Sequence, residues 1–191
     1  MLTNIFERVQ GFLLMPVETF QKAREDSLES ALGYYVVLLI IYAALTAAIV
    51  AIVGITLSGF FGRALGLSGA ALPLVIFVGM IIGGILSVFI GGAWLHLWVW
   101  LLGGKKGYGQ TIKSLMYGST PHFLIGWIPV IGLLGALWSF ILVIFGIREL
   151  HQISTGRSIA AVIIAILVPF FLVVILGLAF FAIGSRTITP Y

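Results

Sequence analysis

Cysteine is absent from this chain of 191 residues, and charge is scarce. Without cysteine the chain forms no disulfide, no thiolate metal site and no thiol nucleophile, so three classes of site are excluded. Charged residues make up only 8% of the sequence, whereas 61% of the residues are hydrophobic. A soluble globular domain needs charge over much of its surface, so lipid is the expected solvent of this chain.

Acidic residues are rarest where the chain is most apolar. From Ser30 to the end, Glu149 is the single acid, while seven Lys and Arg residues stand at the ends of long uncharged stretches. These bases form no stripe with interleaved aromatic residues on a polar scaffold, so the net charge of +4 does not indicate nucleic-acid binding. They indicate orientation in a bilayer, and membrane lipids are the expected surroundings.

The apolar stretches predict an all-α integral membrane protein with a bundle of five transmembrane helices. We expect spans at about 28–57, 72–102, 110–127, 131–147 and 159–183, which together form a membrane domain over 28–184. A short tail at 185–191 follows on the outer side. The third span is weakly apolar, so it is either a full crossing or a re-entrant helix.

Residues 1–27 predict a cytoplasmic, amphipathic N-terminal segment rather than a span. Its apolar residues recur at helical spacing: Ile5, Phe6, Val9, Phe12 and Leu13. This pattern is typical of a helix that lies on the membrane surface, or of one that packs on the bundle. Pro16 suits the first turn of a second such helix. Asp26 and Glu29 have the spacing of a capping box, which predicts the start of the first span.

The placement of lysine and arginine predicts the topology, because these residues concentrate on the cytoplasmic side of a membrane. With five crossings and a cytoplasmic amino terminus, eight of the ten bases fall on the inner side and two, Arg63 and Arg186, on the outer side. Without the third span the division becomes seven to three. The charges therefore favour five crossings and a C-terminus outside the cell.

Two stretches carry a pattern found in a known family: GGKKGYGQTIKSLMYGSTP at 103–121 and GIRELHQISTGRSIA at 146–160. Together with the five-span layout they resemble the Ypt-interacting protein (Yip) domain family. The resemblance implies a multi-pass membrane protein whose eukaryotic relatives act in vesicle traffic and bind prenylated Rab-type GTPases. Those relatives carry a long cytosolic N-terminal region that is short here, so GTPase binding is not carried over. The short form resembles prokaryotic members, which implies the cytoplasmic membrane of a prokaryote.

The second predicted span carries small residues four positions apart: Gly79, Gly83, Ser87 and Gly91. We name these residues the seam. Residues four apart share one helix face, and small side chains let helices approach closely in lipid. The same spacing recurs at the end of the first span in Gly54, Ser58 and Gly62. We expect the seam to pack against that first span or, alternatively, against a second copy of the chain.

Polar residues in the third span are candidates for a kink or for a cavity: Tyr117, Ser119, Thr120, Pro121 and His122. Such groups are costly in lipid unless they are paired or hydrated. Pro121 removes a backbone hydrogen bond, and the neighbouring hydroxyls are placed to satisfy the freed carbonyl. The alternative is a hydrated cavity that His96 also lines. A three-histidine metal site with His151 conflicts with the different depths of these residues, so neither a metal nor a cofactor is expected.

The predicted cytoplasmic face gathers six polar candidates: Lys105, Lys106, Lys113, Arg148, Glu149 and His151. We expect Glu149 to meet one of the three lysines across this face. A single carboxylate cannot supply paired-carboxylate chemistry, and the sequence holds no nucleophile elbow, zincin or phosphate-loop motif. The glycine-rich basic segment GGKKGYG is more typical of a lipid-headgroup contact than of a nucleotide site.

These features predict a non-enzymatic membrane scaffold, a membrane-organising or trafficking-like protein of the Yip-like class. Its expected partners are membrane lipids, a second copy of the chain, or another membrane or cytoplasmic protein. The alternative is a small-solute or lipid transporter or channel whose polar cavity is lined by Tyr117, Thr120 and His122.

Overall fold

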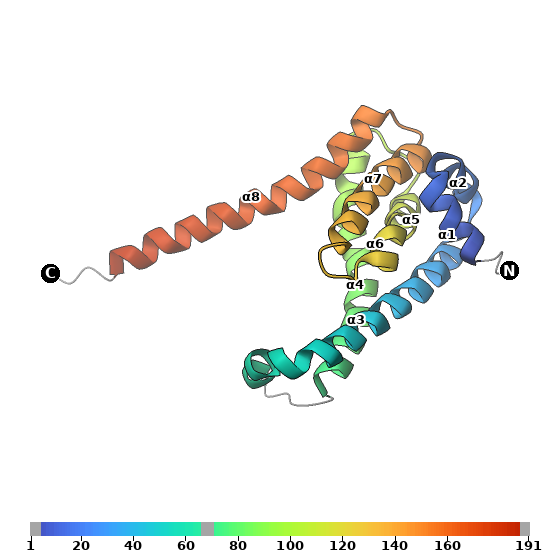
Figure 1. The fold of residues 1–191 in the computed structure, drawn as a ribbon. Coiled ribbons are helices and arrows are strands. Elements are labelled where there is room, and N and C mark those ends of the chain that lie inside the picture. The colour runs from blue at the N-terminus through green and yellow to red at the C-terminus, as the bar shows by residue number, and fades with distance from the viewer. Residues whose placement is uncertain (1–4, 66–70, 188–191) are drawn as a thin grey trace.

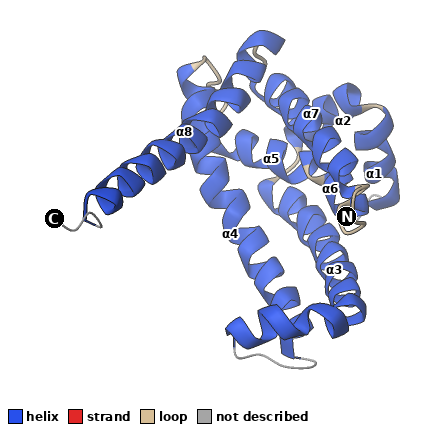
Figure 2. Ribbon diagram, turned by 60° about the vertical axis from the view of Figure 1, so that its left-hand side comes forward, coloured by secondary structure: helices blue, strands red, loops and turns tan. Residues whose placement is uncertain are grey.

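The computed structural model describes residues 5–65 and 71–187, and no strand occurs in these two ranges. The long helices, in chain order, are α3 (Leu28–Leu65), α4 (Ala71–Leu101), α7 (Gly132–His151) and α8 (Thr155–Thr187). The short ones are α1 (Ile5–Leu14), α2 (Pro16–Lys22), the 3₁₀ turn η1 (Ala23–Glu25), α5 (Tyr108–Gly118) and α6 (Thr120–Ile125). Figure 2 shows helices joined by short loops. The all-α prediction is therefore confirmed.

Four helices in the described ranges are long and apolar enough to cross a membrane. They contain the segments Leu28–Ile52, Ala71–Leu101, Gly132–His151 and Thr155–Leu178. These four correspond to the predicted spans one, two, four and five, which confirms a multi-pass membrane protein. The helix that contains the fifth span reaches Thr187, and the tail residues 188–191 lie outside the described part of the chain.

The predicted third span, 110–127, is not one continuous helix. The chain forms α5, bends at Ser119, and continues as the six-residue α6 with Pro121 in its first turn. Proline cannot donate the backbone bond that would continue α5, which accounts for the break. The kink expected around Pro121 is therefore a break between two short helices, and neither belongs to the four helices of the described ranges that are long and apolar enough to cross a membrane.

The α5–α6 pair runs antiparallel to α7 in the centre of the molecule (Figures 1 and 2). A Cβ atom added to Gly118 would lie 2.6 Å from the Val143 side chain, and one added to Gly146 would lie 3.0 Å from Ser114. Glycine is required at both places because the helices approach so closely. α3 and α4 pack beside this pair, and α1 and α2 cover α5 and α7 at one end.

α8 packs on the bundle only over its first half. Ala161, Val162 and Ala165 are buried against α4 and α7, whereas Phe170 and Phe171 are exposed. In Figure 1 the remainder of the helix extends away from the other helices. The described side chains at 170–178 and 180–181 are all exposed, as suits a helix whose solvent is lipid.

Candidate functional site

A polar contact ties the N-terminal helix to the middle of the chain. Arg8 Nη2 lies 3.0 Å from Asp26 Oδ2, and the Tyr117 hydroxyl donates a 2.5 Å hydrogen bond to the same oxygen. Arg8 Nη1 donates to the Tyr117 hydroxyl at 3.2 Å. Each of the three side chains therefore contacts the other two, and hydrogen bonds to charged groups are the stronger kind. We call this arrangement the N-terminal latch.

Aromatic packing surrounds the latch. The ring of Phe12 stacks on Tyr117 with centroids 4.6 Å apart and an interplanar angle of 19°. Phe20 meets Phe12 edge to face, and both side chains are fully buried. The apolar face of the N-terminal segment thus packs on the bundle, the second of the two arrangements expected for it. Phe6 and Leu14, on the rest of α1, remain exposed.

Ser27, not Asp26, caps the first long helix. The Ser27 hydroxyl accepts a 3.1 Å hydrogen bond from the backbone N–H of Ser30, while the carboxylate of Asp26 is engaged in the latch. The predicted capping box with Glu29 is therefore wrong. The serine stands one position later and fulfils the same need, since the first N–H groups of a helix have no partner within it.

Lys113 is a buried cation that binds backbone rather than a carboxylate. Its ammonium donates to three carbonyl oxygens, those of Ala23, Arg24 and Asp26, at 3.2, 2.8 and 2.9 Å. These carbonyls end the 3₁₀ turn η1, where helix dipoles concentrate negative charge. Lys113 thereby holds the α2–η1–α3 corner against α5.

Glu149 binds arginines instead of the lysines expected for it. Its Oε2 atom accepts from Arg24 at 3.1 Å and from Gln21 at 3.0 Å, and Oε1 accepts from Arg148 at 2.8 Å. The expected pair with a lysine is therefore wrong: Lys113 is taken by backbone carbonyls, and the structure shows no ion pair from Lys105 or Lys106 among the described residues. The Glu149 carboxylate fastens α2 to α7.

Two of the three histidines meet through a threonine. Thr111 Oγ1 lies 2.8 Å from His96 Nδ1 and 2.9 Å from His151 Nε2. The hydroxyl has one proton and two acceptor lone pairs, so it donates to at most one of the two rings. His122 lies elsewhere, against Tyr42. In the described ranges no three His, Cys, Asp or Glu side chains are grouped to hold a metal ion.

Thr120 and Tyr34 satisfy the polar groups next to Pro121, whereas the buried His122 Nδ1 has no hydrogen-bond partner among the described residues. Thr120 Oγ1 donates to the Tyr117 carbonyl at 2.7 Å and lies 2.9 Å from the Tyr34 hydroxyl. The freed carbonyl thus has a hydroxyl partner, the arrangement expected for a proline kink. Tyr117 and Thr120 are fully buried, and neither lines the cavity that Ser119 reaches. The alternative of a polar cavity at Tyr117, Thr120 and His122 gains no support from these contacts.

The loop between α4 and α5 presents two exposed bases, Lys105 and Lys106. Gly103 and Gly107 flank them with φ angles of 101° and 90°, which side chains other than glycine rarely adopt. Backbone conformation therefore explains two of the four glycines of GGKKGYG, Gly103 and Gly107. The Lys105 ammonium lies 3.9 Å from the centroid of the Trp100 ring, a cation–π contact.

The predicted seam on α4 is open. A Cβ atom added to Gly79, Gly83 or Gly91 would have no described atom within 4 Å, and all four seam residues are exposed. The expectation that the seam packs within the bundle is therefore not met by the described residues. The surroundings of Gly54, Ser58 and Gly62 lie outside the described part of the structure. Close helix contacts are instead made by Gly118 and Gly146.

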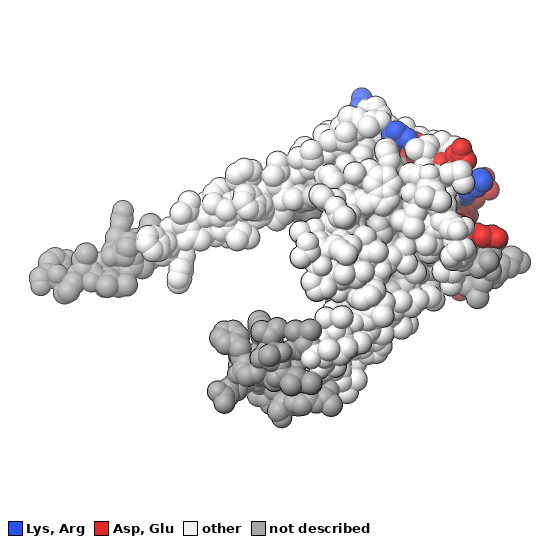
Figure 3. All heavy atoms as spheres, viewed as in Figure 1, with Lys and Arg blue, Asp and Glu red and all other residues white. Residues whose placement is uncertain are grey.

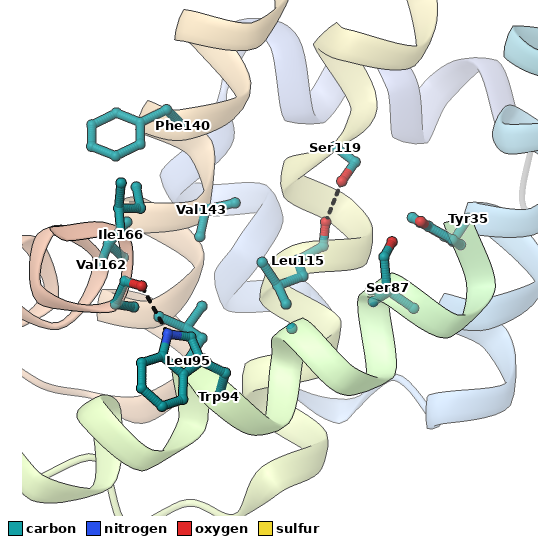
Figure 4. A pocket seen from close by; sticks show the side chains of 13 residues that line it. Tyr35, Ser87, Trp94, Leu95, Leu115, Ser119, Phe140, Val143, Val162 and Ile166 are labelled. Atoms are coloured by element: carbon teal, nitrogen blue, oxygen red, sulfur yellow. Dashed lines mark hydrogen bonds between the residues drawn. The ribbon is translucent and has the colours of Figure 1, made fainter. Parts of the chain in front are cut away.

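An apolar groove of about 340 Å³ lies between α4, α7 and α8. Its walls include Gly91, Leu95, Phe140, Val162 and Ile166 (Figure 4). Three hydroxyls also reach it, but each already donates to a backbone carbonyl: Tyr35 and Ser87 to Gly84, and Ser119 to Leu115. The groove therefore offers an apolar surface with no unmet hydrogen-bond donor from these side chains.

Several residues at these sites carried no local signal in the sequence. Arg8 and Tyr117 are 109 positions apart, and no spacing rule connects them. Trp94 donates a 2.8 Å hydrogen bond to the Ala165 carbonyl. For this contact the sequence did carry a signal. Pro169 lies inside an apolar run and has no N–H, so it leaves the carbonyl four residues earlier, at Ala165, without its helical partner.

Comparison with known proteins agrees with this architecture. The family model of the Yip1 domain matches residues 11–179, nearly the whole chain. No curated protein and no solved structure matches the chain. The family is not known as one of enzymes. The match confirms the resemblance carried by segments 103–121 and 146–160, and it includes the four apolar segments that could span a membrane. The chain therefore belongs to the Yip1 domain family of membrane proteins.

Proposed function

We propose that the protein is a non-enzymatic membrane scaffold that presents a rigid charged face at one end and associates with a second copy through α4. The observation that carries this proposal is the state of the polar residues at that end. Arg8, Asp26, Lys113 and Glu149 are all engaged in contacts that join separate helices. Groups held in this way stabilise a surface and are not free to act on a substrate.

The charged face is a platform of fixed shape. Lys and Arg, together with Asp and Glu, gather at one end of the molecule, over the N-terminal helices and the end of α7, while the long apolar helices show no charge in this view (Figure 3). Glu18, Lys22 and Lys106 are exposed there. A rigid, charged and exposed surface suits docking of a protein partner by electrostatic complementarity.

The proposed topology places this face in the cytoplasm of a prokaryote, with five crossings and an outer C-terminus. The support is that the charged end includes both Lys105, after α4, and Arg157, at the start of α8. A Cβ atom on Gly103 would lie 3.1 Å from Arg157 Nη1, so the two junctions are adjacent. The chain that leaves this end in α5–α6 returns to it in α7, which supports α5–α6 as the third crossing.

Self-association through the seam supplies the second element of a scaffold. Exposed small residues on one helix face allow close approach of another helix in lipid. Gly83 has open space around it, so isoleucine is compatible with the folded monomer. We expect Gly83→Ile to abolish dimer cross-linking in proteoliposomes, while Gly33→Ile, also in open space but on α3, keeps it.

A photoreactive amino acid at position 106 tests whether a protein partner binds the charged face. The scaffold predicts one discrete cross-linked protein that disappears when Glu18 and Glu25, exposed acids of the same face, are changed to lysine. A chain that is monomeric in lipid and yields no discrete cross-link at this face would contradict the proposal.

A further inference from the structure

The groove between α4, α7 and α8 has the shape and chemistry of a site for an apolar chain. It forms because α8 is anchored on both flanks and then leaves the bundle. Ser158 Oγ donates to the Ile144 carbonyl at 2.6 Å on α7, and the Ala165 carbonyl accepts from Trp94 on α4. Beyond this point Ile166 is half exposed, and it forms part of the groove wall.

The lining excludes a polar solute. Ligand pockets usually place a few free polar groups to orient a ligand. Here the hydroxyls of Tyr35, Ser87 and Ser119 are bonded to backbone carbonyls, and the Trp94 indole N–H is bonded to Ala165. The cavity of about 340 Å³ is within the range of small-molecule sites, so the matching occupant is a hydrocarbon segment.

Exposed bases stand at the end of the groove nearest the charged face. Arg157 lies five residues before Val162 and nine before Ile166 on α8, which places it about 8 and 14 Å along the helix from these groove residues. Lys105 and Lys106 follow the end of α4, the opposite wall. The structure shows no carboxylate paired with Arg157, Lys105 or Lys106 in the described ranges. Positive charge above an apolar groove complements an anionic headgroup above its acyl chain.

We propose that this groove holds one acyl chain of an anionic phospholipid whose phosphate binds at Arg157 and the Lys105–Lys106 loop. The hydrocarbon alone gains nothing by leaving the bilayer, because lipid tails are as apolar as the groove. Selection therefore rests on the headgroup. Each base near the surface favours an anionic lipid by about fivefold. This inference goes beyond the scaffold role and does not depend on it.

The test uses the full-length protein in nanodiscs containing trace phosphatidylglycerol with a diazirine in mid-chain, or phosphatidylcholine with the same chain. We expect saturable labelling of α4 and α8 groove peptides by phosphatidylglycerol, well above about fivefold over phosphatidylcholine because three bases contribute. Gly91→Leu fills the groove and should lower this labelling several-fold. Gly79→Leu is the matched control, since it lies on the same face in equally open space but outside the groove lining.

Two further variants test whether the loss of labelling comes from filling the groove and whether the lipid preference comes from Arg157. Ile166→Trp fills the groove from the opposite wall and should also lower labelling. Arg157→Gln should reduce the preference for phosphatidylglycerol about fivefold, whereas Lys22→Gln, an exposed base on α2, should not. Circular dichroism and the elution profile of each variant check its fold.

Three results would overturn the lipid site: equal labelling of wild type, Gly91→Leu and Ile166→Trp; equal labelling by the two lipids; or inter-chain cross-links in place of acyl labelling at the groove. The last result would mean that a second copy fills the groove. Loss of dimers in Gly83→Ile with unchanged acyl labelling would separate the scaffold proposal from this one.

Discussion

The indole N–H of Trp94 donates a 2.8 Å hydrogen bond to the carbonyl of Ala165, the carbonyl that Pro169 leaves without its helical partner. An unpaired carbonyl is costly in a membrane helix, so a side chain from a neighbouring helix takes the place of the missing N–H. One contact thus explains why a proline is tolerated in α8 and why α8 is held to α4 at the groove.

The first prediction concerns this contact. Trp94→Phe should destabilise the protein by about 1 kcal/mol, because it removes the donor and keeps most of the apolar ring. In a Pro169→Ala background the backbone N–H at 169 bonds the Ala165 carbonyl itself, so the same change at Trp94 should cost markedly less. Unfolding in mixed micelles measures the free-energy cost of Trp94→Phe in each of the two backgrounds. Equal costs in both backgrounds would show that the hydrogen bond contributes nothing.

The N-terminal latch gives the second prediction. Tyr117→Phe deletes a buried hydroxyl that donates to Asp26 and accepts from Arg8, so we expect a loss of about 1–3 kcal/mol. α1 should exchange its amide hydrogens faster, because the hydrogen bond from Arg8 to α5 is lost, while the Arg8–Asp26 pair remains. Tyr108→Phe is the control, because that hydroxyl bonds only the Phe89 carbonyl at an exposed site. Unchanged exchange in α1 would argue against the latch.

A third prediction addresses the fastening of α2 to α7. Glu149→Gln removes the charge that binds Arg24 and Arg148, and should weaken the protein by about 1–3 kcal/mol. Exposed Glu25→Gln on η1 should change stability by less than about 0.5 kcal/mol. Limited proteolysis near α2 provides a local readout. If both variants are cleaved like the wild type, Glu149 does not hold α2.

The glycines of the bundle supply the fourth prediction. Gly118→Ala would place a methyl group 2.6 Å from the Val143 side chain and 3.1 Å from its backbone nitrogen, so the helices must separate. Overpacking of this kind costs about 1–3 kcal/mol. Gly83→Ala meets open space and replaces a weak helix former, so stability should stay the same or rise slightly. Thermal unfolding in detergent compares the stability of the two variants. If Gly83→Ala were the less stable one, the close helix contact would lie on the seam.

Sequence reasoning located the long helices well. Hydropathy predicted the second span at 72–102, and α4 occupies Ala71–Leu101. Such agreement is expected because every backbone group in lipid must be bonded within its own helix, so the length of an apolar run fixes the element. The break at Ser119 carried a signal in Pro121, but proline alone does not distinguish a kinked helix from two short ones.

The predictions that the structure did not meet share a physical cause. A helix surrounded by lipid is apolar on every face, so spacing showed that Gly79, Gly83 and Gly91 share a face but not whether that face is inward. The partners of Glu149 were misassigned because charge pairing across a fold has no period in the sequence. The contact of Arg8 with Tyr117 joins the N-terminal helix to the middle of the chain, and only the packing of α1 on α5 brings it about.

The sidedness of Val130 tests the central claim, which is that α5–α6 crosses the membrane and that the junctions with Lys106 and Gln152 lie together on the opposite side from Val130. The native chain has no cysteine, so single cysteines at 106, 130 and 152 report directly with an impermeant maleimide. Val130 is strongly exposed in the turn between α6 and α7. The account predicts that Lys106→Cys and Gln152→Cys are labelled from the cytoplasmic side and Val130→Cys from the opposite side. Labelling of Val130→Cys from the same side as Lys106→Cys would contradict it.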